Sequence, residues 1–345
     1  MAIAYSTDQT FAEHEYRGYS HPEHPGRIRA VWDTLQASEL LGEFQHIQPV
    51  PAKREVLQLA HSEAHIDQLA WIAGQDRLVL IDHDTYALPQ SYDIARRAAG
   101  AAVQVTEAVL NNQADNGLVV VRPPGHHATS DRAMGFCLLN NIAIAARAAQ
   151  RLHQVERILI VDYDVHHGNG TQDIFYDDPG VTFISTHQSP FYPGTGHINQ
   201  TGSSSGEGYT LNIPMPGGQG DQNYLQVFDE IIYPAAERYQ PQLILVSAGF
   251  DAHWVDPLAN MKLSLTGYAQ LTQKLIQMAE KLCEGKIVFV MEGGYDLQAL
   301  AHGITNIGYA LLGRDTVSDP YGPAKGSEPD ISPLIEQIRQ IHNLA

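Results

Sequence analysis

The sequence predicts an α/β protein with a single domain, in which helices flank both faces of a mostly parallel, multi-stranded sheet. Short apolar runs rich in β-branched residues alternate along the chain with longer stretches of helical spacing. The runs are apolar at consecutive positions, as expected for strands buried on both faces of a parallel sheet. A chain of 345 residues is long enough to form such a domain around one large core.

The first third of the chain begins with a short strand, predicted at residues 2–5. Residues 21–27 contain two prolines and a glycine, which preclude a helix, so we expect this loop at the surface or at the rim of a site. We then expect helices at 27–41, 55–73 and 91–110, with a short apolar run at 79–85 that ends in acidic residues.

The middle of the chain has β-α-β order. A buried strand at 117–121 runs into a rigid Pro-Pro-Gly turn and then into the adjacent residues His126 and His127. Asn140 and Asn141 are suited to cap a helix, because apolar residues follow at helical spacing up to Leu152. That helix leads to an apolar strand at 157–161.

Further strands and helices alternate in the second half. A short helix is expected after Thr171, and longer ones at about 225–239, where Pro241 follows, and 265–282, where Gly285 follows. The expected strands are 181–187, 209–213, 243–247 and 286–290.

The C-terminal part adds no second domain. Residues 313–333 are polar and rich in proline and glycine, so we interpret them as a linker or lid, followed by a helix at 334–345. We therefore interpret residues 1–345 as one domain.

Composition limits the class of partner. There are 21 Lys and Arg against 39 Asp and Glu, a net charge of −18, which disfavours nucleic acid and anionic membranes and favours cationic substrates. The only cysteines, Cys137 and Cys283, are too few for a disulfide framework or a thiolate zinc site. With no secretory or membrane-spanning pattern, we expect a soluble cytoplasmic protein.

Residues capable of binding a metal follow several predicted strands. In extended chain Asp162, Asp164 and His166 share one face, because side chains alternate. Ligands bind beyond the carboxyl ends of parallel strands, so the loops after residues 121, 161, 247 and 290 should face one crevice. Asp164 and His166, with Asp251 from a nearby strand, form a ligand set without thiolate that suits a catalytic zinc ion with an open position for water.

Amide hydrolysis also requires groups that accept and donate protons and a donor to the oxyanion. His126 and His127 suit the proton transfers, and Tyr295, after two glycines, suits the third role. Asp162 and Asn169 are candidates to orient the two histidines. The carboxylate would raise imidazole basicity more than the amide, so the two histidines should differ.

Five segments, in order over residues 15–310, resemble the zinc-dependent histone deacetylase family. The asparagine at position 169 makes the chain similar to the class II branch of this family and to its bacterial relatives, the histone deacetylase-like and acetylpolyamine amidohydrolases. The segments are Arg122–Ala128, Gly135–Asn141, Asp162–Thr171, Gly249–His253 and Glu292–Tyr295.

The resemblance implies an arginase-like α/β domain and assigns the same metal, proton-transfer and oxyanion residues. It also implies an acyl channel and its rim, an arginine (Arg27) beside an internal cavity, and structural potassium sites near Asp162 and Ser185 and near Phe175 and Val181. The implied substrate-binding residues are Asp84, Gly135, Phe136, Tyr192, Leu258 and Gly294.

The leading hypothesis is a zinc-dependent deacetylase, although the ligand set also accepts Fe²⁺. Its substrates would be acetyl-lysine side chains or small acetylated amines such as polyamines. Leu258, where polyamine-selective relatives can have Glu, weighs against polyamines, and the acidic composition weighs for a cationic amine. The alternative of a two-metal ureohydrolase is disfavoured, because its second metal ion would need further carboxylate ligands after the same strands. A non-catalytic acetyl-lysine-binding scaffold is disfavoured because Tyr295, replaced by His in weakly active relatives, is retained. A homo-oligomer stays open.

Overall fold

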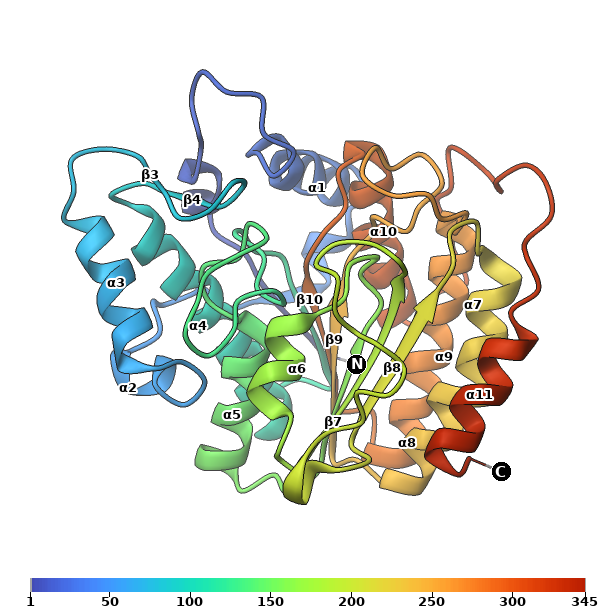
Figure 1. Cartoon of the computed structure of the whole chain (residues 1–345). Coiled ribbons are helices and arrows are strands. Elements are labelled where there is room, and N and C mark those ends of the chain that lie inside the picture. The colour runs from blue at the N-terminus through green and yellow to red at the C-terminus, as the bar shows by residue number, and fades with distance from the viewer. Residues whose placement is uncertain (1, 345) are drawn as a thin grey trace.

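The computed structural model, which describes residues 2–344, contains an eight-stranded sheet in the order β2-β1-β5-β10-β9-β6-β7-β8, and every neighbouring pair in it is parallel (Figure 1). The predicted fold class is therefore confirmed. The strands are β1 (Ile3–Ser6), β2 (Phe44–His46), β5 (Asn116–Val119), β6 (Ile158–Asp162), β7 (Val181–Gln188), β8 (Thr210–Met215), β9 (Leu243–Ala248) and β10 (Ile287–Met291). A separate antiparallel pair joins β3 (Val79–Leu80) to β4 (Tyr86–Ala87).

Helices cover both faces of the sheet (Figure 1). One face carries α4 (Ser91–Leu110), α5 (Asn141–His153) and α6 (Asn169–Phe175), with α2 (Arg54–Leu57) and α3 (Glu63–Ala73) farther out. The other face carries α1 (Gly26–Ala37), α7 (Asp221–Val227), α8 (Tyr233–Tyr239), α9 (Leu265–Cys283), α10 (Leu297–Leu311) and α11 (Ser332–His342). None of these helices is long and apolar enough to cross a membrane.

The central strands are buried along their whole length, as their continuous apolar runs predict. The predicted cap also forms: the Asn140 side chain accepts a hydrogen bond of 3.0 Å from the N–H of Ala143 and starts α5. Strand β6 lies between β9 and β7, and its last residue, Asp162, is paired with Ser247 and Ser185. The sheet thus delivers Asp162 to the centre of its carboxyl edge.

Several element boundaries differ from the prediction. The helix expected at 27–41 ends at Ala37, and the one expected at 55–73 is broken before Ser62, whose hydroxyl caps α3. The helix expected at 225–239 starts at Asp221 and contains a π-helical turn, Phe228–Ile232, just before Pro234. Strand β2 and helix α10 were not expected.

Residues 313–331 cross the outside of the second helical layer and end at α11, which begins two residues before the predicted position. Hydrogen bonds fix this segment to the body of the domain. The Glu328 carboxylate accepts N–H groups at the start of α7, and Gly322 accepts the indole N–H of Trp254. The Tyr321 hydroxyl donates to Asp296 over 2.8 Å. The segment is therefore closely attached to the loop after β10.

Candidate active site at the carboxyl edge of the sheet

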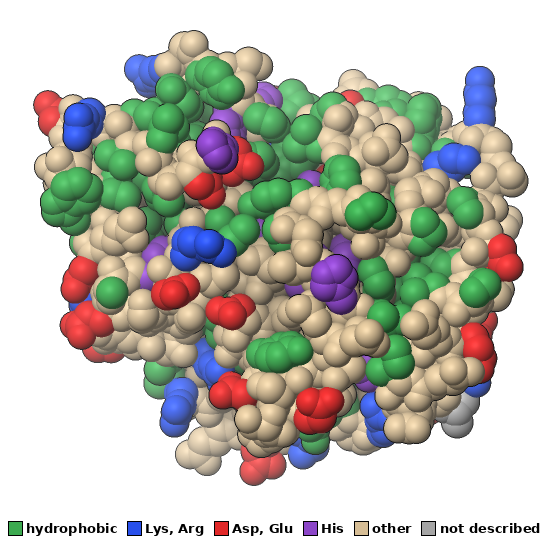
Figure 2. All heavy atoms as spheres, viewed as in Figure 1, with side chains coloured by type: hydrophobic (Ala, Val, Ile, Leu, Met, Phe, Trp, Pro, Cys, Tyr) green, Lys and Arg blue, Asp and Glu red, His purple; other side chains and the backbone are tan. Residues whose placement is uncertain are grey.

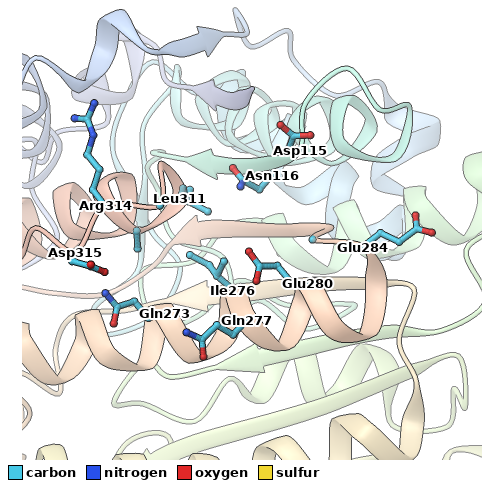
Figure 3. Close-up of a pocket in the computed structure, with 13 residues that line it drawn as sticks. Asp115, Asn116, Gln273, Ile276, Gln277, Glu280, Glu284, Leu311, Arg314 and Asp315 are labelled. Atoms are coloured by element: carbon cyan, nitrogen blue, oxygen red, sulfur yellow. The ribbon is translucent and has the colours of Figure 1, made fainter. Parts of the chain in front are cut away.

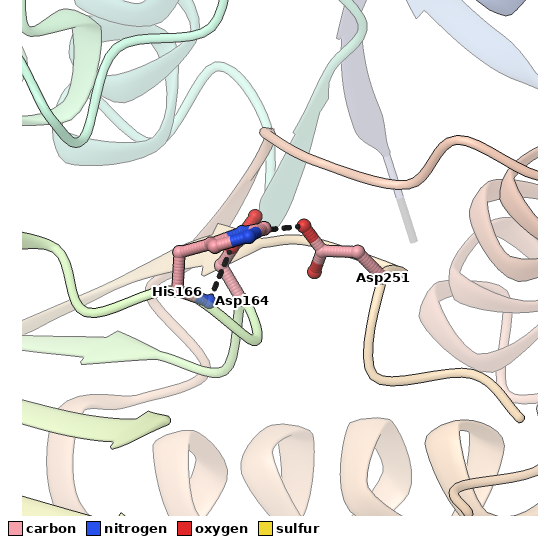
Figure 4. Close-up of side chains that lie close together, drawn as sticks. All are labelled: Asp164, His166 and Asp251. Atoms are coloured by element: carbon pink, nitrogen blue, oxygen red, sulfur yellow. Dashed lines mark hydrogen bonds and ion pairs between the residues drawn. The ribbon is translucent and has the colours of Figure 1, made fainter. Parts of the chain in front are cut away.

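Asp164, His166 and Asp251 converge from the loops after β6 and β9 (Figure 4). The His166 Nδ1 atom lies 3.2 Å from Asp164 Oδ1 and 3.1 Å from Asp251 Oδ2. All three side chains are buried, and one ligand atom from each lies within 4.8 Å of the others. Backbone N–H groups hold the carboxylates: Val165 donates to Asp251 Oδ1 and Gly293 to Asp164 Oδ2.

This cluster fits a divalent cation. Tetrahedral ligands at zinc-like bond lengths lie about 3.3 Å apart, close to the two separations observed. Two buried carboxylates need a compensating cation, yet no Lys or Arg of residues 2–344 forms an ion pair with either one. A side chain at Gly249 or Gly293 would collide with these carboxylates, so glycine keeps the cluster compact.

His126 and His127 lie beside the cluster with their rings 4.0 Å apart. The Nδ1 atom of His126 lies 3.0 Å from Asp162 Oδ2, and that of His127 lies 2.7 Å from Asn169 Oδ1. Since both oxygens accept, each Nδ1 carries the proton, and each Nε2 is free to exchange a proton with a ligand. The structure thus pairs one histidine with a carboxylate and the other with an amide, as the sequence suggests.

The two histidines have opposite electrostatic environments. Burial lowers the pKa of His126, but the charges of Asp164 and Asp162 outweigh it and raise this pKa above its usual value. Burial, together with the neighbouring His126 and His166, lowers the pKa of His127 well below its usual value. The two imidazoles therefore have pKa values shifted in opposite directions.

Tyr295 follows β10 and reaches the same place. Its ring packs edge-on against Phe136, with centroids 5.9 Å apart, and the guanidinium of Arg27 lies 5.0 Å from the ring centre. Burial raises the pKa of Tyr295 well above its usual value, so the hydroxyl stays protonated and can donate a hydrogen bond. Arg27 is fully buried, and its Nε donates to the Gly294 carbonyl over 2.7 Å.

A cavity of about 360 Å³ leads from the surface to these groups. Tyr192 packs edge-on to His127 at 5.2 Å, and Phe191 stacks on His166 at 5.4 Å, so aromatic rings line its base. The lining residues are Tyr19, Ser20, His21, Pro22, His83, Asp84, His127, Gly135, Phe136, His166, Phe191, Tyr192, Leu258 and Tyr295. The prediction that the four post-strand loops meet is confirmed, because His126, Asp164, Asp251 and Tyr295 come from them.

Comparison with known proteins supports the same conclusion. A family model described as the histone deacetylase domain matches residues 21–311. The chain belongs to the histone deacetylase family. It is 40% identical over 345 residues to histone deacetylase 14, chloroplastic, of Arabidopsis thaliana, an alignment that covers 94% of this chain and 82% of that protein.

Two further matches agree. A probable deacetylase of Archaeoglobus fulgidus is 42% identical over 312 residues, which cover 89% of this chain and 85% of that one. The crystal structure of the HDA15 HD domain superposes with a TM-score of 0.90 at 35% identity, covering 99% of this chain and 96% of that chain. The deacetylase fold therefore extends over nearly the whole chain.

Of the substrate-binding residues expected in this deacetylase-family chain, five line the cavity: Asp84, Gly135, Phe136, Tyr192 and Leu258. Gly294 does not; it is buried, and its carbonyl accepts from Arg27. Its φ of +117° requires glycine where the chain turns toward Tyr295.

Sequence analysis assigned no role to two residues that shape the site. Phe191 lies in the loop after β7, and proline on both sides of the Phe-Tyr pair was the available signal. Glu292 is buried, and its Oε2 accepts the N–H groups of Gly125 and His126 at 2.7 and 3.2 Å. An acidic residue directly after a buried strand was the signal for Glu292. The rim position expected for residues 21–27 is confirmed for His21 and Pro22.

A larger cavity, of about 790 Å³, lies at the opposite edge of the sheet, between α9 and α10 (Figure 3). Its wall carries Gln273, Gln277 and Glu280 from α9, and Arg314, which pairs with Glu43. Among residues 2–344, the one cluster suited to a metal is Asp164, His166 and Asp251, which does not touch this cavity. The candidate site residues therefore lie at the smaller cavity.

Proposed function

We propose that this protein is a zinc-dependent amidohydrolase that removes acetyl or similar acyl groups from lysine side chains or related amines. The observation that carries the proposal is the convergence of three elements at the base of one cavity: the Asp164–His166–Asp251 cluster, the two histidines with different partners, and Tyr295. The family membership supports deacylation as the reaction.

Zinc bound by Asp164, His166 and Asp251 would supply a Lewis acid that brings the pKa of water to about 7 and polarises the acyl carbonyl. The neutral Nε2 of one histidine takes the proton of the attacking water, and the other histidine delivers a proton to the leaving amine. The Tyr295 hydroxyl donates to the oxygen that becomes negative in the transition state.

The lining of the cavity supports an extended, unbranched acylated amine as substrate. The aromatic side chains of Phe136 and Tyr192 line it together with the metal-ligand candidate His166, and an apolar wall suits the methylene chain of lysine or a polyamine. Asp84 also lines the cavity, and we assign it to the rim, where a carboxylate can accept a peptide N–H group or pair with a second amine. Peptide and small-amine substrates are therefore the two arms of the test.

We further propose potassium as a structural ion near the Asp162 carbonyl and Ser185, and near Phe175 and Val181. The support is the family membership and the burial of these residues, which lie within or at the ends of β6, α6 and β7. Fe²⁺ is the other cation that this ligand set would accept at the catalytic position.

The deciding experiment compares hydrolysis of an acetyl-lysine peptide and of an acetylated polyamine by the zinc-loaded protein. We expect turnover of at least one, reduced about 10²–10³-fold by Tyr295→Phe, and abolished by Asp251→Ala or His127→Ala without loss of the fold. The ratio of the two rates assigns the substrate class. Near-wild-type turnover in Asp251→Ala or His127→Ala would overturn the mechanism. No turnover of either substrate with zinc bound would favour an acyl-lysine-binding scaffold.

A further inference from the structure

Asp256 is a buried carboxylate that lies between the two loops which carry the chemistry. The residue is only 6% exposed. Among residues 2–344 it forms no ion pair. Oδ2 accepts the N–H groups of Tyr295 at 2.7 Å and of Asp296 at 3.3 Å, and Oδ1 accepts that of Leu258 at 2.9 Å. A buried carboxyl group costs free energy unless hydrogen bonds offset that cost, so these three bonds should matter to the site.

The loop that holds Asp256 is itself rigid. It starts at Asp251, and the N–H of Ala252 donates to the hydroxyl of the buried Tyr268 over 3.1 Å. The backbones of Ala252 and Trp254 bond to that of Leu263. The N–H of Asp256 donates to the carbonyl of His253 over 2.9 Å. The carboxylate is thus held at a fixed distance from the metal-ligand residue Asp251.

Besides Asp256, other groups hold the segment that carries Tyr295 on either side of the tyrosine. On the far side, the Asp296 side chain accepts the N–H of Ala299 and the hydroxyl of Tyr321, each over 2.8 Å. Gly293 bonds to Asp164 and to the N–H of Phe250, and the Gly294 carbonyl bonds to Arg27. Beyond Gly294, whose φ of +117° leaves the backbone free to turn, the next backbone group is the N–H that Asp256 accepts. Asp256 therefore fixes the point from which the Tyr295 side chain enters the cavity.

We propose that Asp256 is a positioning residue: through Oδ2 it sets the position of the oxyanion donor Tyr295, and through Oδ1 it sets that of Leu258 at the channel mouth. This inference rests on the proposed function for its kinetic consequences, but not for the structural coupling itself. A displacement of about 1 Å in such a group can cost about 10²-fold in rate.

Two substitutions at Asp256 separate the two oxygens. Asp256→Ala removes all three acceptor contacts, so we expect kcat to fall about 10–100-fold and KM to rise. Asp256→Asn keeps one oxygen, which should turn toward the two N–H groups of Tyr295 and Asp296, leaving its amide facing Leu258. In that variant kcat should stay within about 3-fold of wild type while KM rises.

The kinetic test combines Asp256→Ala with Tyr295→Phe. If Asp256 acts through the tyrosine hydroxyl, Asp256→Ala should lower kcat by less than about 2-fold in the Tyr295→Phe background. An equal loss of kcat in both backgrounds would overturn the proposal, as would an Asn variant that loses as much kcat as the Ala variant.

Amide hydrogen exchange of the metal-free protein tests the coupling without any turnover. The amides of Tyr295 and Asp296 should exchange at least about 10-fold faster in Asp256→Ala, and unchanged exchange would overturn the proposal. Glu328→Ala is the matched control. Its carboxylate also accepts three backbone N–H groups, those of Gly220, Gln222 and Asn223, none of which lines the channel. Glu328→Ala should accelerate the exchange of these three amides only, and it should leave kcat and KM unchanged. If the wild type is inactive but the variants show this exchange pattern, the proposed function is refuted and the structural coupling through Asp256 stands.

Discussion

At the scale of single residues, the difference between Asp162 and Asn169 distinguishes two otherwise similar histidines. Both orient an imidazole through Nδ1, but only Asp162 carries a charge that stabilises the protonated ring. The spacing in the sequence was sufficient to suggest both partners. Asp162 is two residues before Asp164 and Asn169 is five residues after it, so both lie near the end of the same strand. It could not predict Asp256, since nothing local indicates that its oxygens accept from a loop about 40 residues away.

Asn169→Asp tests this asymmetry. A carboxylate at 2.7 Å from His127 Nδ1 should raise the pKa of His127, which is now lowered by burial, His126 and His166. One limb of the pH profile of kcat/KM should therefore move upward by about one pH unit. If His127 must be neutral to act as a base, the acidic limb moves; if it must be protonated, the basic limb moves. A profile with neither limb moved would show that His127 exchanges no proton in the rate-limiting steps.

Asp251 supplies a second test at this scale, on metal binding. Zinc at about a hundred times its Kd should raise the free energy of unfolding of the wild type by about 2.7 kcal/mol. Asp251→Asn should lose this gain, yet it should be at least as stable as wild type without metal, because it removes one of two neighbouring buried carboxylates. Urea denaturation with and without zinc measures both. A metal-free variant much less stable than the wild type would mean that Asp251 serves mainly to hold the fold.

At the scale of elements, predictions succeeded where a local pattern decides the structure. The strand runs and the Asn140 cap formed as expected because burial and a short-range hydrogen bond specify them. Helix α10 is the exception: its apolar residues do repeat with helical spacing, yet no helix was predicted between Tyr295 and residue 313. Gly303 within it is required by the ring of Phe250, a contact between distant segments that no local pattern reveals.

A buried group of charges connects three elements and predicts acid sensitivity. Glu23 bonds to Arg27 of α1 and to Arg122, after β5, and all three side chains are fully buried. Burial raises the pKa of Glu23, but Arg122 and Arg27 outweigh it and lower the pKa to about 2. Because the folded pKa lies below the unfolded one, the stabilisation is complete above pH of about 4.5 and is lost as the pH falls toward 2.

Glu23→Gln should therefore lower the free energy of unfolding by about 3 kcal/mol at pH 7, and the difference from wild type should shrink below pH of about 4.5. Urea denaturation between pH 7 and pH 3.5 measures it. Glu43→Gln, which removes an exposed pair with Arg314, is the control and should change stability by less than about 1 kcal/mol. If the two free energies of unfolding differ by the same amount at every pH, the charge of Glu23 does not contribute to stability.

At the scale of the whole molecule, the site exists because β5, β10, β9 and β6 are neighbours in one parallel sheet. The alternation of strands with helices along the sequence predicted that their loops face one crevice. The order of the strands depends on packing between distant segments: Gly117 of β5 pairs with Val288 of β10. The net charge of −18 acts at the same scale. Figure 2 shows no extended patch of Lys and Arg on the face that it draws. Asp84 lines the smaller cavity, and its backbone N–H donates to the carboxylate of Asp82 over 3.1 Å.

This charge distribution predicts how salt affects turnover. Acidic charge near an entrance raises the local concentration of cations, and salt screens it over about 10 Å at 0.1 M. The kcat/KM for an acetyl-lysine peptide flanked by lysines should fall several-fold between 20 and 300 mM NaCl, and that for a glutamine-flanked peptide by less than about 2-fold. Asp82→Asn with Asp84→Asn should flatten the salt dependence. Neutralising Glu280 and Asp315, beside the distant cavity, should leave it intact, because charges beyond the screening length contribute little. If both pairs of substitutions flatten the salt dependence equally, the charge of the whole molecule attracts the substrate. If the two peptides show equal salt dependence, electrostatic selection of cationic substrates is excluded.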